Sequence, residues 1–304
     1  MMTIAVCICT FRRPDGLRNA LEHVAKLDFD GELYVVVADN DAAGEGLAVV
    51  EQLRDEYRWP LLSTAVSDSG ISYSRNAAAN LALTKSPEFI AFLDDDEWPN
   101  PDWLHELLRI QREHDADAVG GPTLSVFPEG TPDTIRNNPY YGADLGMADG
   151  SACQLEAAGN FLIRTDKLRA LGPEFFHPDF AKSGGEDLAF FMKLKNSGAS
   201  MHWSANAVMN ESVPHDRLSI EWMKQRVIII ANSRVRVLRM LQPGLLASLE
   251  RCAKTCALFA QAAVMSLLGL FSKQLAEKAQ ILRWKFQGKL SAHLQVNISR
   301  AEGR

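Results

Sequence analysis

Short apolar runs alternate with helical patterns through the first hundred residues of the chain. Four runs rich in β-branched and apolar residues predict buried strands at 3–11, 33–39, 61–66 and 88–94. Apolar residues recur at helical spacing in the segments between them, 14–27, 46–57 and 72–85. Near-continuous apolar strands separated by helices are typical of a mainly parallel sheet that helices cover on both faces. We therefore predict an α/β, Rossmann-like fold.

The pattern is less regular in the middle of the chain. Residues 116–127 predict another strand, and 153–172 predict a strand followed by a short helix that begins at Thr165. Residues 128–150 are rich in Pro, Gly and Asp, which predicts a surface loop or flap. Residues 183–198 predict a helix with glycines before and after it.

The last part of the chain predicts helices. A long helix is expected over 217–241, and a second helical stretch over 245–290 follows the breaker "QPG". Composition changes at the same place, because 217–304 is basic and apolar. We therefore predict two domains, an α/β domain over 1–216 and a C-terminal helical extension over 217–304.

Charge is segregated between these two parts. Residues 217–304 hold 15 Lys and Arg against 4 Asp and Glu, whereas residues 1–216 hold 17 against 34. Residues 257–271 are apolar on nearly all sides, but as a helix they cover only about 22 Å of a hydrocarbon core about 30 Å thick. We predict no membrane-spanning helix. The stretch 245–290 suits a helix lying in the plane of an anionic membrane, and packing on the body or on a second subunit is the alternative.

An acidic cluster follows the strand predicted at 88–94. Asp94 and Asp96 flank Asp95, so in an extended chain they point to the same side. Two hard oxygen donors at a strand end suit Mg²⁺ or Mn²⁺ shared with a substrate phosphate. Ligands of parallel sheets bind beyond such strand ends. A calcium loop would need a different spacing, and the remaining alternative is a solvated acidic turn that opens a helix.

A second acidic pair, Glu186 and Asp187, follows Gly184 and Gly185 at the start of the helix predicted over 183–198. Acids in a first helical turn are favoured by the helix dipole, and this preference alone could explain the pair. A transferase that acts on a hydroxyl acceptor also needs a carboxylate base away from the metal. Asp187 or Glu186 is our candidate for this base.

Other candidates stand at compatible places in the chain. Arg75 could neutralise a phosphate or form a surface salt bridge, and His215 could add a nitrogen ligand to a metal or be structural. Asp39, at a predicted strand end, could accept a hydrogen bond from a base edge or a ribose hydroxyl. Three residues after the first strand could contact a nucleotide: Thr10, Arg12 and Arg13.

Five segments in this order carry a family resemblance: "AVCICTFRRPDGLRNAL", "VVVADN", "GISYSRNAAANLA", "FLDDDEWPNPDWL" and "GGEDLAFFMKLKNSG". Together they resemble the inverting family 2 glycosyltransferases of the GT-A fold. Within that family they are most similar to the bacterial exopolysaccharide, succinoglycan-type, glucosyltransferases. The resemblance covers residues 3–240, and its most specific parts are the acidic strand end and the later Glu-Asp pair.

The resemblance implies a GT-A fold and transfer of a sugar from a nucleoside diphosphate sugar, with UDP-hexose as the default donor, in polysaccharide biosynthesis. It implies that Asp39 contacts the nucleobase, that Asp94 and Asp95 contact ribose and phosphates, and that Asp96 binds Mg²⁺ or Mn²⁺. It further implies that Asp187 is the general base and that His215 contacts metal or diphosphate. The implied acceptor is a glycan or a polyprenyl-linked oligosaccharide.

Two other functions are compatible with the same predicted α/β fold. A sugar nucleotidyltransferase would place a Gly-rich phosphate loop after the first strand, where "CTFRRPDG" has one late glycine. An inactive GT-A-fold scaffold would be favoured if the acids were replaced, and they are present. We see no nucleic-acid recognition motif. The start of the chain shows no secretory signal, and the five cysteines lack zinc-finger spacing, so we expect a cytoplasmic protein, peripheral on the inner membrane.

Overall fold

The computed structural model describes residues 2–136, 138, 140–141, 146–296 and 298 of the chain. Its main sheet has the strand order β3-β2-β1-β4-β8-β6-β9, in which β8 alone runs antiparallel to its neighbours. The strands are β1 (Thr3–Thr10), β2 (Glu32–Asp39), β3 (Leu61–Ala65), β4 (Phe89–Asp94), β6 (Ala118–Gly120), β8 (Phe161–Arg164) and β9 (Met201–Trp203). The predicted mainly parallel sheet is confirmed.

The central strands carry apolar side chains on both faces, and helices cover both faces of the sheet and bury them. Residues of β1 alternate between two cores, with Ile8 in one and Cys7 in the other. The first core includes side chains of α1 (Pro14–Val24), α2 (Glu45–Leu53) and α4 (Trp103–His114). The second includes side chains of α3 (Ile71–Leu83), α6 (Thr165–Ala170) and α7 (Glu186–Asn196).

The strand ends meet at one edge of the sheet. In the register of the parallel strands, Thr10 at the end of β1 pairs with Asp39 at the end of β2. Cys9 pairs with Asp94 at the end of β4. The three polar residues that terminate strands therefore lie side by side, as the pattern of a parallel sheet requires.

The strand predicted over 116–127 is wrong as a single element. The structure places β6 in the main sheet and β7 (Thr123–Val126) in a second sheet with β5 (Glu97–Pro99) and β10 (Met209–Ser212). The chain changes sheets at Gly120 and Gly121, and a Cβ at Gly121 would collide with the Ala207 carbonyl oxygen. In the predicted loop 128–150 the structure has a short helix, α5 (Asp133–Arg136), and residues 137, 139 and 142–145 lie outside the described part.

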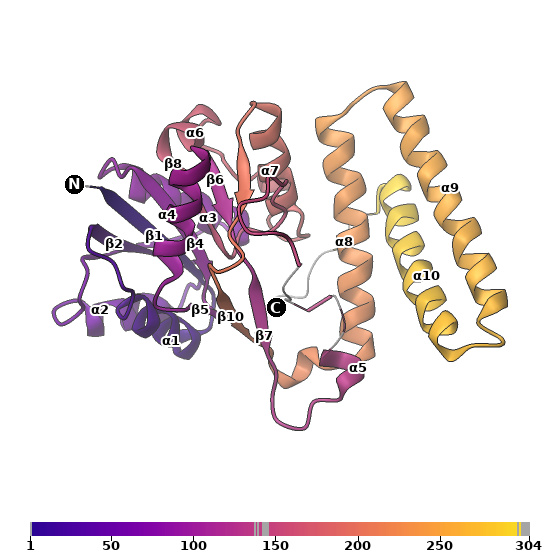
Figure 1. Cartoon of the computed structure of the whole chain (residues 1–304), viewed down its shortest axis with the longest axis horizontal. Helices are drawn as coiled ribbons and strands as arrows, with labels where there is room; N and C mark the ends of the chain where they lie inside the picture. The colour runs from indigo at the N-terminus through magenta and orange to yellow at the C-terminus, as the bar shows by residue number, and fades with distance from the viewer. Residues whose placement is uncertain (1, 137, 139, 142–145, 297, 299–304) are drawn as a thin grey trace.

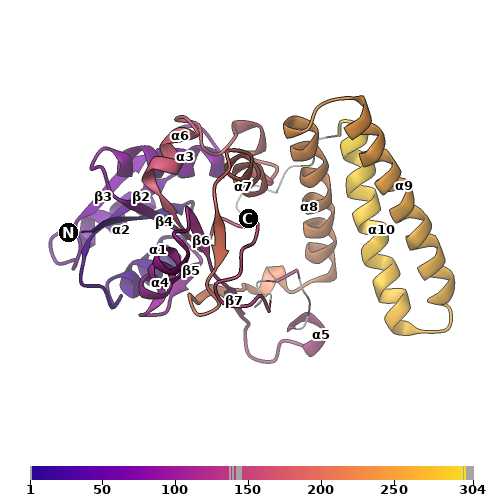
Figure 2. The ribbon, with the colours of Figure 1, turned by 45° about the horizontal axis from the view of Figure 1, so that its top comes forward.

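Three long helices follow and stand to one side of the sheet-containing body (Figure 1): α8 (Ile220–Leu241), α9 (Leu245–Leu268) and α10 (Lys273–His293). The single helical stretch predicted over 245–290 is wrong, because the chain reverses between α9 and α10. Gly269 ends α9, and Gly288 lets α10 pack closely on α8, since a Cβ there would collide with the Ile228 carbonyl oxygen. In both ribbon views α9 lies farthest from the body (Figures 1 and 2).

Most of α9 faces solvent. Thr255 and Ala262 are its buried residues, and its outward side includes Val264 and Leu267. Among the helices of the described residues, none combines the length and the hydropathy that a membrane-spanning segment requires.

Candidate active site

One buried guanidinium joins the two acidic segments. Arg75, in the first turns of α3, is 3% exposed. Its Nη2 donates to both carboxylate oxygens of Asp94, at 3.0 and 3.1 Å. Its Nη1 donates to Glu186 Oε1 at 3.2 Å and to Asp187 Oδ1. The structure thus brings the acidic end of β4 and the first turn of α7 together, about 90 residues apart in sequence, and excludes a surface salt bridge for Arg75.

Glu186 and Asp187 occupy different environments on this guanidinium. The Glu186 side chain is 2% exposed, whereas that of Asp187 is 24% exposed. The second oxygen of Glu186, Oε2, is buried without a hydrogen-bond partner among the described residues. Asp187 is therefore the carboxylate of the pair that an acceptor in solution can reach.

Asp95 and Asp96 are bound by residues other than Arg75. Asp95 accepts hydrogen bonds from Thr10 Oγ1 at 2.9 Å, from the Phe11 amide at 3.2 Å and from Arg13 at 2.9 Å. Burial raises the pKa of Asp95 to about 6, although Arg13 opposes this shift. Asp96 Oδ2 accepts from Arg13 at 2.8 Å and from Arg217 at 3.1 Å.

Two further carboxyl groups, those of Glu97 and Glu211, lie next to this cluster. Glu97 is buried and accepts a hydrogen bond from the Asp94 amide at 3.2 Å. Burial, followed by the charge of Asp94, raises the pKa of Glu97 well above its usual value. Burial also raises the pKa of Glu211, which is ion-paired to Arg217 at 3.0 Å.

The acids outnumber the arginines that hold them. Seven carboxyl groups lie in this region: Asp94, Asp95, Asp96, Glu97, Glu186, Asp187 and Glu211. Arg13, Arg75 and Arg217 ion-pair with them, and Arg226 adds positive charge near Glu211. Even without Glu97 and Glu211, whose pKa values are raised, five carboxyl groups face these four arginines, and this excess of negative charge favours a bound cation.

A divalent metal fits this arrangement as a ligand shared with substrate. Within the described ranges, no group of three or more His, Cys, Asp and Glu side chains is arranged to hold a metal ion by itself. Mg²⁺ is usually held by one or two carboxylates together with substrate phosphates. Asp96 uses only Oδ2 in its described ion pairs and its side chain is 18% exposed, so Oδ1 can serve as such a ligand.

The remaining predicted residues are placed less directly. Asp39 is buried, and its two oxygens accept from the amides of Asp41 at 2.9 Å and Leu47 at 3.1 Å. Arg12 is exposed and ion-paired to Asp41 at 3.4 Å. The nucleobase contact of Asp39 and the nucleotide contact of Arg12 stay predictions.

His215 does not join the cluster through its own side chain. It is exposed in the short 3₁₀ helix η2 (His215–Arg217), and in the part of the chain described here no hydrogen bond or ion pair links its ring to an acid. Arg217, two residues later, makes that connection instead. The metal contact of His215 stays a prediction.

Sequence reasoning missed Arg217, Glu211 and Glu97 as members of the site. Glu97 carried a signal, since it directly follows three acids. Arg217, in the turn after the second sheet, binds both Asp96 and Glu211 of β10, and no local sequence pattern predicts these contacts. A cavity of about 570 Å³ opens beside Asp95 and Asp96, between the start of α1 and Pro214.

Comparisons with known proteins agree on one family. The model of "Glycosyl transferase family 2" matches residues 5–172. The succinoglycan biosynthesis protein ExoM of Rhizobium meliloti is 34% identical over 225 residues, which span 73% of this chain and 71% of that protein. The poly(ribitol-phosphate) beta-N-acetylglucosaminyltransferase TarS of Staphylococcus aureus is 26% identical over 44% of this chain and 23% of its own.

Solved structures share the fold. TarS residues 1–349 in complex with UDP match 100% of this chain and 95% of that chain, with a TM-score of 0.55 and 18% identity. The mannosyltransferase PcManGT from Pyrobaculum calidifontis, in complex with GDP-Man and Mn²⁺, matches 96% and 87% with a TM-score of 0.65 and 16% identity. The predicted GT-A fold is confirmed.

Proposed function

Because the chain belongs to glycosyl transferase family 2, we propose that it moves a sugar from a nucleoside diphosphate sugar, with UDP-hexose as the expected donor, to a hydroxyl of a glycan or lipid-linked acceptor. The observation that carries this proposal is Arg75, whose guanidinium binds Asp94 on one side and Asp187 on the other. The donor's phosphates and the base for the acceptor then lie on opposite sides of one fixed group.

The proposed reaction is a single in-line displacement at the anomeric carbon. Asp187 removes the proton of the acceptor hydroxyl while its oxygen forms the new bond to that carbon. The bond from the carbon to the diphosphate oxygen breaks, the nucleoside diphosphate leaves, and the configuration inverts. Glu186 is too buried to meet the acceptor, so its role is to hold Arg75 beside Asp187.

Asp96, together with Asp94, would hold Mg²⁺ or Mn²⁺ when donor is bound. The metal would supply positive charge to the departing diphosphate. Arg13 and Arg217 hold the Asp96 carboxylate in place, and Arg75 holds that of Asp94. Asp95, bonded to Thr10 and Arg13, fixes the loop after β1, on which Arg12 is exposed for a nucleotide.

The helical part suits contact with a membrane surface, and we assign residues 217–304 to that role and 1–216 to catalysis. From Thr255 to Ser272 the chain carries no charge, yet most of these side chains are exposed on α9. Lysines of α10, such as Lys273 and Lys278, lie next to this apolar surface in the sequence and suit anionic lipid. A peripheral position on the cytoplasmic face would present a lipid-linked acceptor to Asp187.

The test is transfer of labelled sugar from UDP-glucose, and from other nucleotide sugars, to membranes of cells that lack this chain. Asp187→Asn should lower the rate roughly 10²- to 10⁴-fold, because the acceptor proton loses its base. UDP binding should change less than threefold. Asp102→Asn, which alters an exposed carboxylate at the start of α4, is the matched control and should keep full activity. Equal rates for wild type and Asp187→Asn would refute the mechanism.

A further inference from the structure

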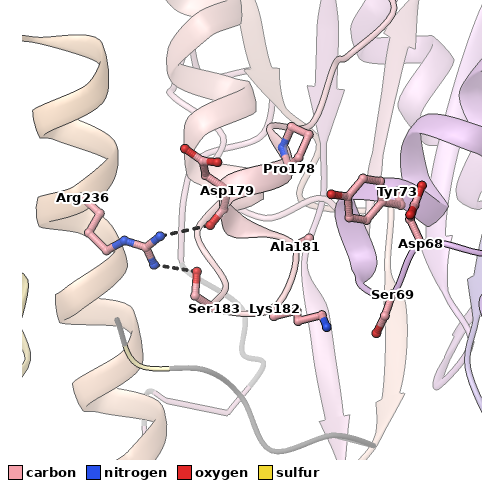
Figure 3. Close-up of a pocket in the computed structure, with 9 residues that line it drawn as sticks. All are labelled: Asp68, Ser69, Tyr73, Pro178, Asp179, Ala181, Lys182, Ser183 and Arg236. Atoms are coloured by element: carbon pink, nitrogen blue, oxygen red, sulfur yellow. Dashed lines mark hydrogen bonds between the residues drawn. The ribbon is translucent and has the colours of Figure 1, made fainter. Parts of the chain in front are cut away.

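A second cavity, of about 500 Å³, opens on the α8 side of the body (Figure 3). Its walls come from the loop before α3 and the first turn of that helix, from residues 178–183, and from Arg236 of α8. Its volume is that of a small ligand site. None of the roles proposed above uses it.

Arg236 is a buried cation held by neutral oxygens. Its residue is 9% exposed, and its guanidinium donates to Ser183 Oγ at 2.6 Å and to the Asp179 carbonyl oxygen at 3.0 Å. Over the described residues, no carboxylate lies within ion-pair distance of it, and Figure 3 shows the Asp179 carboxylate turned away from it. Burial, followed by the charge of Arg239, lowers the pKa of Arg236, and the more distant charge of Asp179 only partly opposes this shift. A buried cation of this kind is stabilised by an anion that enters beside it.

Other groups on the cavity wall suit an oxyanion. Lys182 adds a second, exposed positive charge, and Ser69 and Tyr73 add hydroxyl donors. Asp68 and Asp179 also line the cavity, but both are exposed, so water screens their charge far more than that of Arg236. Arginine with lysine and hydroxyl donors is a common combination for phosphate.

The cavity adjoins the segments that carry the two reacting sides. Tyr73 stands two residues before Arg75, and Ser183 four residues before Asp187. Ser233 of α8 also donates to the Ser183 carbonyl oxygen at 3.2 Å, so α8 holds this loop directly. α8 packs against α10, and α10 packs against α9, which carries the apolar surface proposed to contact the membrane.

We propose that this cavity is a phosphate-binding site, separate from the donor site, and that the phosphate is part of a lipid-linked acceptor. The identity of the acceptor rests on the proposed function, whereas phosphate binding by Arg236 and Lys182 does not. A phosphate held here would keep the acceptor next to the loop that leads into α7, whose first turn carries Asp187.

The test is calorimetric titration of geranyl phosphate, and separately of inorganic phosphate, into the full chain saturated with UDP and Mg²⁺. We expect phosphate binding that weakens at least fivefold in Lys182→Gln and at least tenfold in Arg236→Gln. Lys85→Gln removes the same charge from an exposed lysine at the far end of α3 and should change the affinity less than twofold. Geraniol, which lacks the phosphate, should not bind in a Lys182-dependent way.

The two probes separate the sources of phosphate. Geranyl phosphate binding at least tenfold tighter than inorganic phosphate supports the lipid-linked acceptor, whereas equal affinities overturn that source in favour of the free ion. Absence of phosphate binding, or equal binding by wild type and Lys182→Gln, overturns the site even if Arg236→Gln fails to fold. The UDP titration of the same sample tests the proposed function separately, and if UDP does not bind, the phosphate titrations without it still decide the cavity.

Discussion

Arg75 is ion-paired to three carboxylates at once, and its loss should be costly. Arg75→Met would leave Asp94, Glu186 and Asp187 close together without their guanidinium. Removing one partner of a buried ion pair costs about 3–5 kcal/mol. We expect a loss of this size in the free energy of unfolding, measured by urea denaturation.

Arg234→Met is the matched control for that experiment. Arg234 pairs with Glu156 at 3.1 Å, both side chains are about half exposed, and such surface pairs contribute about 0–1 kcal/mol. A cost for Arg75→Met no larger than that for Arg234→Met would contradict the network.

Asp95 should make the metal-free protein less stable as pH rises. Its pKa is raised to about 6, mainly by burial, whereas an unfolded aspartate titrates near 3.8. The folded state therefore binds more protons between these values, and stability from this group is present below pH 4 and lost through pH 6. In EDTA, the melting temperature of wild type relative to Asp95→Asn should fall between pH 4.5 and 7. A rise over that range would show that the Arg13 ion pair outweighs burial.

At the residue scale, the acids at the end of β4 could be predicted, because an apolar run that stops at a polar residue marks the end of a buried strand. Asp94 follows an apolar strand, which places it at the sheet edge, whereas the sequence places Asp187 only at the start of a helix after two glycines. Arg217 could not be found this way, because it reaches Asp96 from an irregular turn after β10. The pairing of Arg75 with carboxylates likewise depends on the depth at which α3 packs, which periodicity does not specify.

The start of α7 is held by a close contact with α8. Gly185 has φ +100°, and a Cβ there would lie 2.7 Å from the Ser233 Cβ. Gly185→Ala should therefore cost about 1–3 kcal/mol for backbone strain and about 1–3 kcal/mol more for overpacking. Because the change displaces Asp187, transferase activity should fall as well, which a rate assay and a urea titration would measure together.

Gly198→Ala separates the two causes. Gly198 ends the same helix with φ +85°, but a Cβ there would meet nothing within 4 Å. Its replacement should therefore show only the strain cost and leave activity unchanged. Equal effects of Gly185→Ala and Gly198→Ala would mean that α8 does not constrain the Asp187 loop.

At the element scale, the βα units of the first hundred residues were predicted with boundaries close to those observed, because period-2 and period-3.6 patterns alternate clearly there. The failures have local causes. The sequence pattern over 116–127 is that of one continuous strand. The chain nevertheless passes from one sheet to the other at Gly120 and Gly121, and the segment forms β6 and β7. Apolar residues run on through 269–272, which concealed the reversal between α9 and α10.

The whole molecule has one side that no described residue covers. Along α9, Val264, Leu267 and the following Phe271 are exposed at 55%, 66% and 89%. Burying such a side chain stabilises by about 1.5–3 kcal/mol, so replacing two of them should be felt strongly. Leu267→Asp with Phe271→Asp should reduce co-sedimentation with phosphatidylglycerol vesicles at least tenfold.

The control for the vesicle experiment is Val126→Asp, an exposed apolar residue on β7 in the body. It should leave vesicle binding unchanged. If the α9 variant instead alters the oligomeric state and not vesicle binding, the surface packs on a second subunit.

At this largest scale, the sequence predicted that a basic, apolar helical part follows the α/β body, but not how it docks. Docking depends on contacts such as those of Arg236 and Ser233 with Ser183, whose partners are distant in sequence. The boundary at residue 217 stays a prediction.

The central claim is that the acidic end of β4 binds a nucleoside diphosphate through a metal. Calorimetric titration of UDP with and without Mn²⁺, into wild type and Asp96→Ala, tests it most directly. The account predicts binding at least tenfold tighter with Mn²⁺, and loss of this metal effect in Asp96→Ala. A UDP affinity that is the same with and without Mn²⁺ and in wild type and Asp96→Ala would contradict it. Absence of binding of UDP, GDP and dTDP under every condition would also contradict it.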